Sequence, residues 1–99
     1  PTDSFVFEGF LAPKQAKRRK ELGALMDEKR TIVIYESPHR ILKTLKDILD
    51  VMGDRDISVM RELTKMFEET IRLKVSEAIK HLTVNYTKGE FIIAIKGAQ

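Results

Sequence analysis

The sequence contains no cysteine. Disulfide bonds, thiolate metal sites and a cysteine nucleophile are therefore excluded, and the absence fits a cytosolic protein. No apolar run approaches the roughly 18 residues that a membrane-spanning helix needs, so no membrane partner is expected. The sequence also lacks the GxGxxG fingerprint and the P-loop, and by itself it holds no complete nucleotide site of either kind.

The remaining composition is that of an ordinary globular domain. The chain has 99 residues, of which 42% are hydrophobic and 33% charged, and this length predicts one domain. The sequence opens PTDSFVF, without an initiator methionine, and enters an alternating apolar stretch almost at once. We therefore expect a piece of a longer protein that was cut at a domain boundary.

Five stretches have the patterns of β-strands. Residues 5–10 alternate with a period of two. Residues 31–35 are continuously apolar, which predicts a central strand covered on both faces. Between the later strands, residues 61–69 are predicted to be a polar connection. The other strands are predicted at 57–60, 70–73 and 91–95.

Three stretches have helical patterns. Good helix formers fill residues 14–28, and apolar residues at helical spacing predict helices over 38–52 and 75–82. Ser37 is the predicted N-cap of the middle helix and Pro38 its first residue. The element order predicts the α/β (α+β) class, with two layers in which about three helices cover a mixed sheet of four to five strands.

The first group of candidate site residues follows the strand at 31–35 and comprises Glu36, Ser37, His39 and Arg40. Ligands gather beyond the C-terminal ends of strands in open α/β sheets, and backbone N–H groups at a helix start can hold an anion. The alternative is local: Ser37 caps the helix, Glu36 and Arg40 form an ion pair, and His39 lies on the surface. No nucleophile stands out beside them, so no catalytic triad is predicted.

Two further groups are candidates. The segment RELTK, residues 61–65, also follows a predicted strand and would share an edge with the first group if the two strands are parallel; the alternative is a solvated loop. The basic segment, residues 14–20, could contact a phosphate backbone, or it is a solvated helix face. No aromatic residues interleave with its cations, so base stacking is not indicated. The cations of the basic segment are Lys14, Lys17, Arg18, Arg19 and Lys20.

No metal site is expected. The carboxylates of Glu68 and Glu69 are adjacent in sequence, and adjacent side chains on a strand or helix do not point the same way. His81 falls late in a short predicted helix, where its charge suits the helix dipole.

At this point several motifs occur together and in order: PTDSFVFEGFL, YESPHR, RELTK, the pair of glutamates and KGEF. Together they closely resemble the C-terminal half of the bacterial small-subunit ribosomal RNA ribose 2'-O-methyltransferases, which belong to the tetrapyrrole (corrin/porphyrin) methylase superfamily. The resemblance covers essentially the whole chain, and YESPHR followed by RELTK is its most specific part.

The resemblance implies an enzyme of two α/β domains that methylates a cytidine of the decoding region with S-adenosylmethionine. Residues 1–99 would be the C-terminal domain, forming one wall of a cofactor cleft that the absent N-terminal domain completes, and would be inactive alone. The implied partners are small-subunit ribosomal RNA, the enzyme's own N-terminal domain and a second copy in a homodimer. The implied location is the cytoplasm.

The resemblance also implies roles for residues. The cofactor would lie near Tyr35, Glu36, Arg61 and Glu62. Substrate or RNA contacts would come from the basic segment and from Ser37, His39, Arg40, Thr64 and Lys65. Glu36, His39 and Lys65 are the candidates for a general base, and none of them is singled out.

The chain departs from the family pattern at a few positions. Ala12 is inserted before Pro13, Phe67 replaces a usual histidine, Leu73 and Lys74 replace Gly-Thr, and Lys88 replaces an arginine. Two alternative functions stay open. The enzyme could methylate a tetrapyrrole or another small molecule, or the domain could be a non-catalytic module for RNA binding or dimerisation.

Overall fold

The structure is a computed structural model that describes residues 4–64, 67–84 and 89–99. None of the helices in these ranges is long and apolar enough to cross a membrane. The elements in chain order are β1 (Phe5–Phe10), α1 (Gln15–Ala24), β2 (Thr31–Glu36), α2 (Ile41–Met52), β3 (Asp56–Thr64), β4 (Phe67–Lys74), α3 (Val75–Val84) and β5 (Glu90–Ile95).

The strands form one mixed sheet in the order β1-β2-β5-β3-β4. β1 and β2 are parallel, and every other neighbouring pair is antiparallel. Because β2 and β3 are both antiparallel to β5, they run in the same direction and their C-terminal ends meet at one edge of the sheet. The predicted class, a mixed sheet with three helices, is confirmed.

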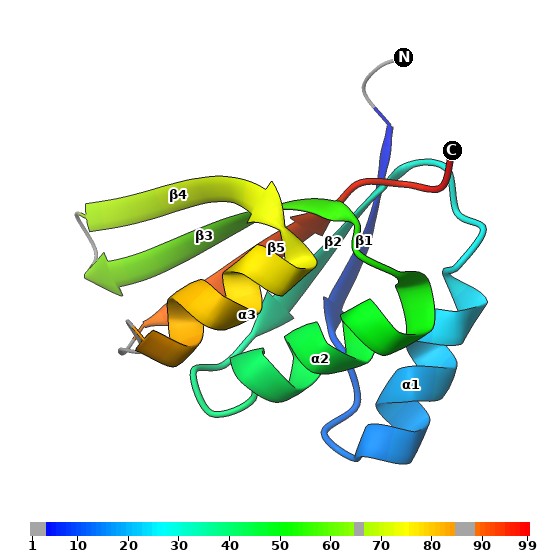
Figure 1. The fold of residues 1–99 in the computed structure, drawn as a ribbon, viewed down its shortest axis with the longest axis horizontal. Coiled ribbons are helices and arrows are strands. Elements are labelled where there is room, and N and C mark those ends of the chain that lie inside the picture. Colours follow the sequence, from blue (N-terminus) through cyan, green and yellow to red (C-terminus); the bar gives the residue numbers. More distant parts are fainter. Residues whose placement is uncertain (1–3, 65–66, 85–88) are drawn as a thin grey trace.

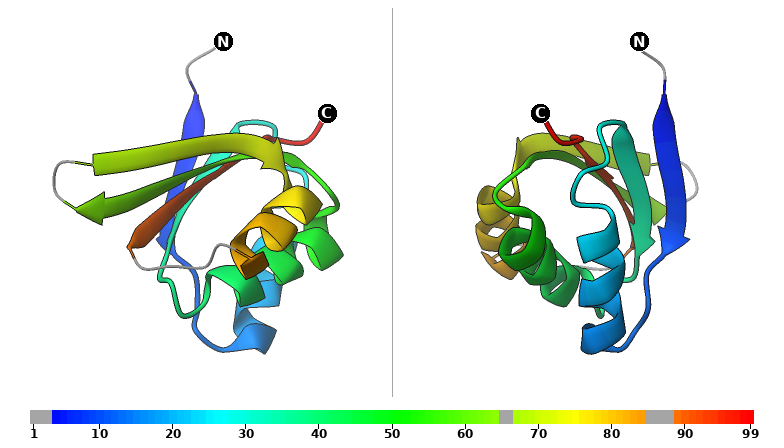
Figure 2. Two further views of the ribbon diagram at one scale, coloured as in Figure 1. Left: turned by 60° about the vertical axis from the view of Figure 1, so that its left-hand side comes forward. Right: turned by 90° about the vertical axis from the view of Figure 1, so that its right-hand side faces the viewer.

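All three helices cover the same face of the sheet (Figures 1 and 2). The crossovers through α1 and α2 step in the same direction across the sheet, so right-handed connections put both helices on one side. The crossover through α3 joins β4 to β5, which run the opposite way and step back across the sheet, so α3 reaches the same side.

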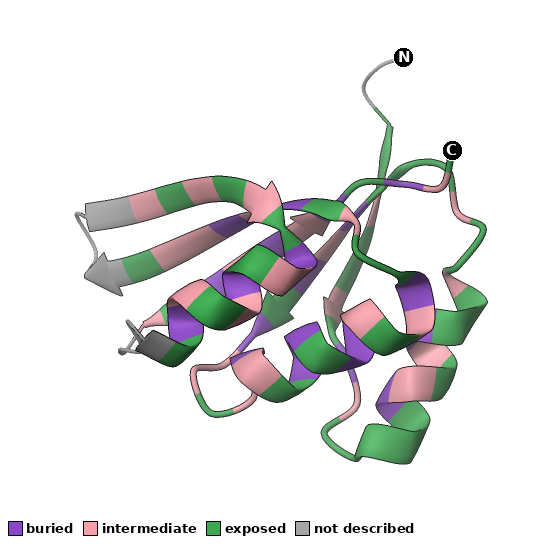
Figure 3. Ribbon diagram, in the orientation of Figure 1, coloured by how far each residue is buried: buried purple, intermediate pink, exposed green. Residues whose placement is uncertain are grey.

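The core lies between the helices and the sheet (Figure 3). Every second residue of β2 and β5 faces the helices, as the period of a strand requires. These side chains meet the apolar stripes of α1 and α2. The central members of this core, each 0–1% exposed, are Leu22, Ile32, Ile34, Ile41, Leu45, Ile48, Phe91, Ile93 and Ile95.

The opposite face of the sheet is uncovered and apolar over β1 and β2. Phe5, Phe7 and Phe10 are 60%, 55% and 57% exposed, and Tyr35 is also exposed. The prediction that residues 31–35 are covered on both faces is therefore wrong, because every helix lies on one side. This uncovered surface is called the open face below.

Two predicted boundaries are also wrong. In the predicted polar connection at 61–69, residues 61–64 and 67–69 belong to two paired strands, β3 and β4, in which Arg61 lies opposite Glu69. Polar side chains suit this hairpin because it extends past the helices (Figure 1). The helix predicted from Pro38 begins at Ile41, because residues 38–40 form a turn.

Candidate functional site

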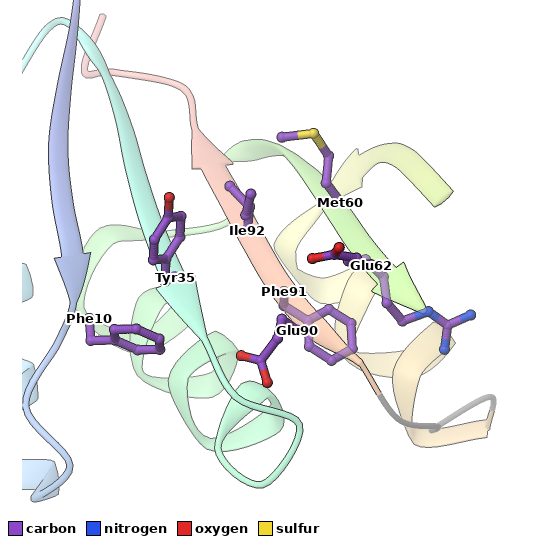
Figure 4. A pocket seen from close by; sticks show the side chains of 8 residues that line it. Phe10, Tyr35, Met60, Glu62, Glu90, Phe91 and Ile92 are labelled. Atoms are coloured by element: carbon purple, nitrogen blue, oxygen red, sulfur yellow. The ribbon is translucent and has the colours of Figure 1, made fainter. Parts of the chain in front are cut away.

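The pocket of the open face lies where β2 and β3 end and β5 begins (Figure 4). It has a volume of about 390 Å³. One register row across the sheet supplies its floor, with Phe10 beside Tyr35, Tyr35 beside Ile92, and Ile92 beside Met60. The remaining lining residues are Arg61, Glu62, Glu90 and Phe91.

One side of the pocket is aromatic. The rings of Phe10 and Tyr35 meet edge to face with their centroids 5.5 Å apart, and Phe7 contacts Tyr35 in the same way at 5.1 Å. These contacts hold the Tyr35 ring at the pocket while leaving it partly exposed. Aromatic rings held in this way offer a flat apolar surface on which another ring can stack.

Carboxylates supply the other side. Glu62 and Glu90 are direct partners in the register of β3 and β5, so their Cβ atoms lie roughly 5 Å apart. Both carboxylates point toward the side where Phe10 and Tyr35 lie (Figure 4). Like charges directly opposite on a sheet are destabilising, so a cationic group in the pocket would relieve an existing repulsion.

Arg61 belongs to the lining of the pocket, but its side chain points to the helix-covered face, because it is the register partner of the buried Phe91 and alternates with Met60 and Glu62 along β3. One of its terminal nitrogens, Nη2, donates to Glu69 at 2.6 Å, and the side chain is 14% exposed. Its Nε and Nη1 atoms are buried and have no hydrogen-bond partner in the described part of the chain. Buried polar groups are usually partnered, so these two nitrogens are exceptions in the described part of the chain.

Glu36 is separated from this pocket although it follows Tyr35 directly. Successive residues of a strand point to opposite faces, and the Glu36 side chain faces the helices and is 2% exposed. Its carboxylate accepts hydrogen bonds from the Ser37 N–H at 2.8 Å and from the Thr44 hydroxyl at 2.6 Å. Arg40 is paired with it at 3.3 Å, as the local interpretation predicted.

The other residues of the turn lie at the same edge. His39 is exposed. The predicted capping by Ser37 is wrong: its hydroxyl is buried with no partner among the described atoms, and its carbonyl instead accepts from the Arg40 and Ile41 N–H groups. Of Thr64 only the backbone is described, at the end of β3, and Lys65 lies outside the described residues.

The basic segment is divided by the structure. Arg18 is buried, donating to Asp47 at 2.7 Å and to the Pro13 carbonyl at 2.7 Å. Arg19 donates to Asp47 and Asp50 on α2. These two arginines therefore join α1 to α2. The cations of the segment that are exposed to solvent are Lys14, Lys17 and Lys20.

The pocket lining thus includes Tyr35, Arg61 and Glu62. The side chains of Tyr35 and Glu62 lie on the open face, whereas those of Glu36 and Arg61 lie on the helix-covered face. We expected YESPHR and RELTK to share an edge of the sheet if the strands that lead into them are parallel. These strands, β2 and β3, do run in the same direction. Sequence reasoning missed the pocket residues of β5 because nothing in the sequence pattern placed this strand between β2 and β3. The KGEF motif was the signal for Glu90. No cluster of three potential metal ligands occurs in the described ranges.

The fold is found in solved methyltransferases. A cobalt precorrin-4 methyltransferase of cobalamin biosynthesis superposes with a TM-score of 0.64 over 96% of this chain and 41% of that one, at 19% sequence identity. A second methyltransferase superposes with a TM-score of 0.61 over 94% of this chain and 41% of that one, at 12% identity. At these identities the likeness establishes the architecture.

The sequence establishes the family. The family described as Tetrapyrrole (Corrin/Porphyrin) Methylases matches residues 1–79, and this chain belongs to it. A Thermotoga maritima protein called Ribosomal RNA small subunit methyltransferase I is 46% identical over 99 residues, which are 100% of this chain and 44% of that protein. A Synechocystis protein of the same name is 48% identical over 98 residues, 98% of this chain and 35% of its own length.

These matches confirm the resemblance inferred from the motifs. They also show that the chain spans less than half of either relative.

Proposed function

We propose that this chain is the C-terminal domain of an S-adenosylmethionine-dependent methyltransferase that acts on the ribose 2'-hydroxyl of a cytidine in small-subunit ribosomal RNA. The observation that carries the proposal is the pocket that combines Tyr35, Arg61 and Glu62 at the sheet edge. The names of the relatives support ribosomal RNA as the substrate.

The pocket fits the chemistry of the cofactor. S-adenosylmethionine supplies a methyl group bound to a positively charged sulfur. The rings of Phe10 and Tyr35 match a nucleobase, and carboxylates such as Glu62 and Glu90 accept hydrogen bonds from ribose hydroxyls and attract a cation. The pocket is open on one side, so these residues would form one wall of the site.

The residues of this chain then act by binding and orientation. Alignment of the ribose oxygen with the methyl group lowers the barrier substantially, and the hydroxyl proton must leave to a base. His39 is exposed at the correct edge of the sheet. Glu36 is buried behind Tyr35 and is already hydrogen-bonded, so it is the less suitable of the two.

The open face suggests where the rest of the enzyme packs. Its exposed phenylalanines on β1 adjoin the pocket, and contiguous apolar surface of this kind marks an interaction site. We propose that the N-terminal domain covers the open face and closes the cofactor site, in a homodimeric cytoplasmic enzyme. Light scattering on the longer protein tests the dimer.

The function is tested by titrating S-adenosylmethionine calorimetrically into the longer protein and into the 99-residue chain, and by following methyl transfer to small-subunit ribosomal RNA. We expect cofactor binding and transfer by the longer protein and neither by the chain alone. A tetrapyrrole serves as the competing substrate. Transfer to the tetrapyrrole but not to RNA would replace the proposed substrate, and comparable cofactor binding by the chain would contradict a shared site.

The exposed lysines of α1 provide a separate test of RNA binding. Replacing Lys17 and Lys20 with glutamate should raise the RNA KM and flatten the salt dependence of binding, by roughly 0.7–0.9 in log–log slope for each phosphate that the variant no longer neutralises. Arg18 is not suitable for this test, because reversing its charge would disrupt the core.

Lys29→Glu with Lys96→Glu is the matched control, since both lysines are exposed and lie at the opposite edge of the sheet. Equal effects in the two double variants, measured across a salt series, would show that net charge alone matters and that α1 makes no specific contact.

A further inference from the structure

The Glu36 carboxylate links three parts of the chain. It stands at the end of β2, and its partners are the Ser37 N–H in the following turn, Arg40 at the end of that turn, and the Thr44 hydroxyl in α2. A buried carboxylate is unfavourable unless it is hydrogen-bonded or paired. Among the described residues, the two hydrogen bonds and the ion pair that compensate Glu36 come from the turn and from the first part of α2.

These contacts replace the ordinary cap of α2. The helix has no side-chain cap at Arg40, and the Ser37 hydroxyl makes no hydrogen bond in the described part of the chain. The turn is therefore held to the sheet through Glu36. Without that carboxylate, residues 37–41 would keep the two backbone hydrogen bonds to the Ser37 carbonyl, the one from the Thr44 N–H to the Arg40 carbonyl, and the buried side chain of Ile41.

The same turn borders the pocket. Tyr35, which precedes Glu36, lines the pocket, and so does Phe91, the partner of Glu36 in the register of β2 and β5. His39, exposed on the turn, is thus placed relative to the pocket by a carboxylate on the other side of the sheet. Neither Glu36 nor His39 lines the pocket, so a change in the Glu36 contacts acts first on the turn that carries His39.

We infer that Glu36 is a positioning residue, fixed by Thr44, that holds the turn 37–40 in the geometry needed for methyl transfer. This inference rests on the proposed function. It assigns Glu36 neither to the cofactor nor to proton removal, the two roles that its place in YESPHR suggested. Thr44, which no sequence motif indicated, holds the Glu36 carboxylate in place through the hydrogen bond from its hydroxyl.

The test uses the longer methyltransferase with Glu36→Gln, Thr44→Val and Thr44→Ser. Glu36→Gln and Thr44→Val should each lower kcat by roughly 10- to 100-fold, as expected for misplaced groups. The cofactor Kd should stay within about twofold of the wild-type value, because neither residue lines the pocket. Thr44→Ser restores the hydroxyl donor and should restore kcat.

Two further measurements separate positioning from mere folding. The double variant Glu36→Gln/Thr44→Val should be no slower than the worse single variant. Both changes act on the same contact, the hydrogen bond from the Thr44 hydroxyl to the Glu36 carboxylate, so their effects on kcat should not add. Amide hydrogen exchange at Ser37, His39 and Arg40 should accelerate in both single variants and not in Thr44→Ser. The kcat values are calculated per active site, and the number of active sites is determined by cofactor titration. The pH–rate profile of Glu36→Gln should keep the shape of the wild-type profile, because Glu36 is not the general base.

Loss of cofactor binding in Glu36→Gln, loss of a limb of its pH–rate profile, or normal activity in Thr44→Val would overturn the inference. The proposed function fails separately, if the wild-type protein transfers no methyl group to ribosomal RNA. In that case the exchange rates of the turn still decide whether Glu36 and Thr44 hold it.

Discussion

Replacing Asp47 with alanine should lower the free energy of unfolding by about 3–5 kcal/mol, because it leaves the charge of Arg18 buried without an anionic partner. The Asp47 carboxylate accepts from Arg18 at 2.7 Å, from Arg19 at 3.0 Å and from Gln15 at 3.1 Å. Arg18 and Asp47 are 2% and 1% exposed. The decrease is a large fraction of the roughly 5–15 kcal/mol that stabilises a domain.

Asp50→Ala is the matched control for this result. Asp50 lies on the same helix and also accepts from Arg19, at 3.3 Å, but its side chain is 61% exposed. Exposed ion pairs contribute about 0–1 kcal/mol. Urea denaturation of the 99-residue chain at pH 7 measures both variants. If Asp47→Ala were no less stable than Asp50→Ala, Arg18 would have found solvent, and the packing of α1 on α2 would not depend on the pair.

The same pair gives a pH dependence. Burial raises the pKa of the Asp47 carboxyl, but the hydrogen bonds from Arg18, Gln15 and Arg19 outweigh it and leave this pKa below its ordinary value. The pKa of Asp47 is lower in the folded state than in the unfolded state. The ionised Asp47 therefore stabilises the fold fully at pH values above its unfolded-state pKa, and this stabilisation is lost as the pH falls through its folded-state pKa. The difference in stability between wild type and Asp47→Ala should therefore shrink in acid.

Arg18 shows why part of the site could not be predicted from the sequence. Within KQAKRRK, nothing distinguishes Arg18 from Lys17. Their different environments arise from Asp47, which is 29 residues away and lies on another helix. Long-range packing of this kind leaves no local pattern, so the sequence predicts all five cations to be available to RNA, whereas the structure leaves the three lysines exposed.

Other features could be predicted because they depend on local periodicity. The strands at 5–10, 31–35 and 91–95 and the apolar stripe of α2 follow from the spacing of their apolar residues. The opposite orientations of Tyr35 and Glu36 also follow from strand periodicity. Two other features, the polar hairpin of β3 and β4 and the insertion of β5 between β2 and β3, depend on strand pairing, which composition does not reveal.

Replacing Tyr35 with alanine in the longer protein should weaken S-adenosylmethionine binding by roughly 5- to 150-fold. Stacking of a nucleobase on an aromatic side chain contributes about 1–3 kcal/mol, and each 1.4 kcal/mol corresponds to a tenfold change in Kd. Tyr35 is the central aromatic residue of the pocket, since both Phe7 and Phe10 pack against its ring. Calorimetric titration of the cofactor measures the effect directly.

Two variants show whether the ring itself is responsible. Tyr35→Phe keeps the stacking surface and its edge-to-face contacts, so its Kd should stay close to that of the wild type. Phe5→Ala removes an aromatic side chain of the open face that is more exposed than Tyr35, but Phe5 does not line the pocket, so it should also leave the Kd unchanged. Equal weakening in Tyr35→Ala and Phe5→Ala would indicate that the open face serves only to dock the rest of the enzyme. Wild-type affinity in Tyr35→Ala would contradict stacking of the cofactor on the Tyr35 ring, the aromatic residue that faces the two carboxylates in Figure 4.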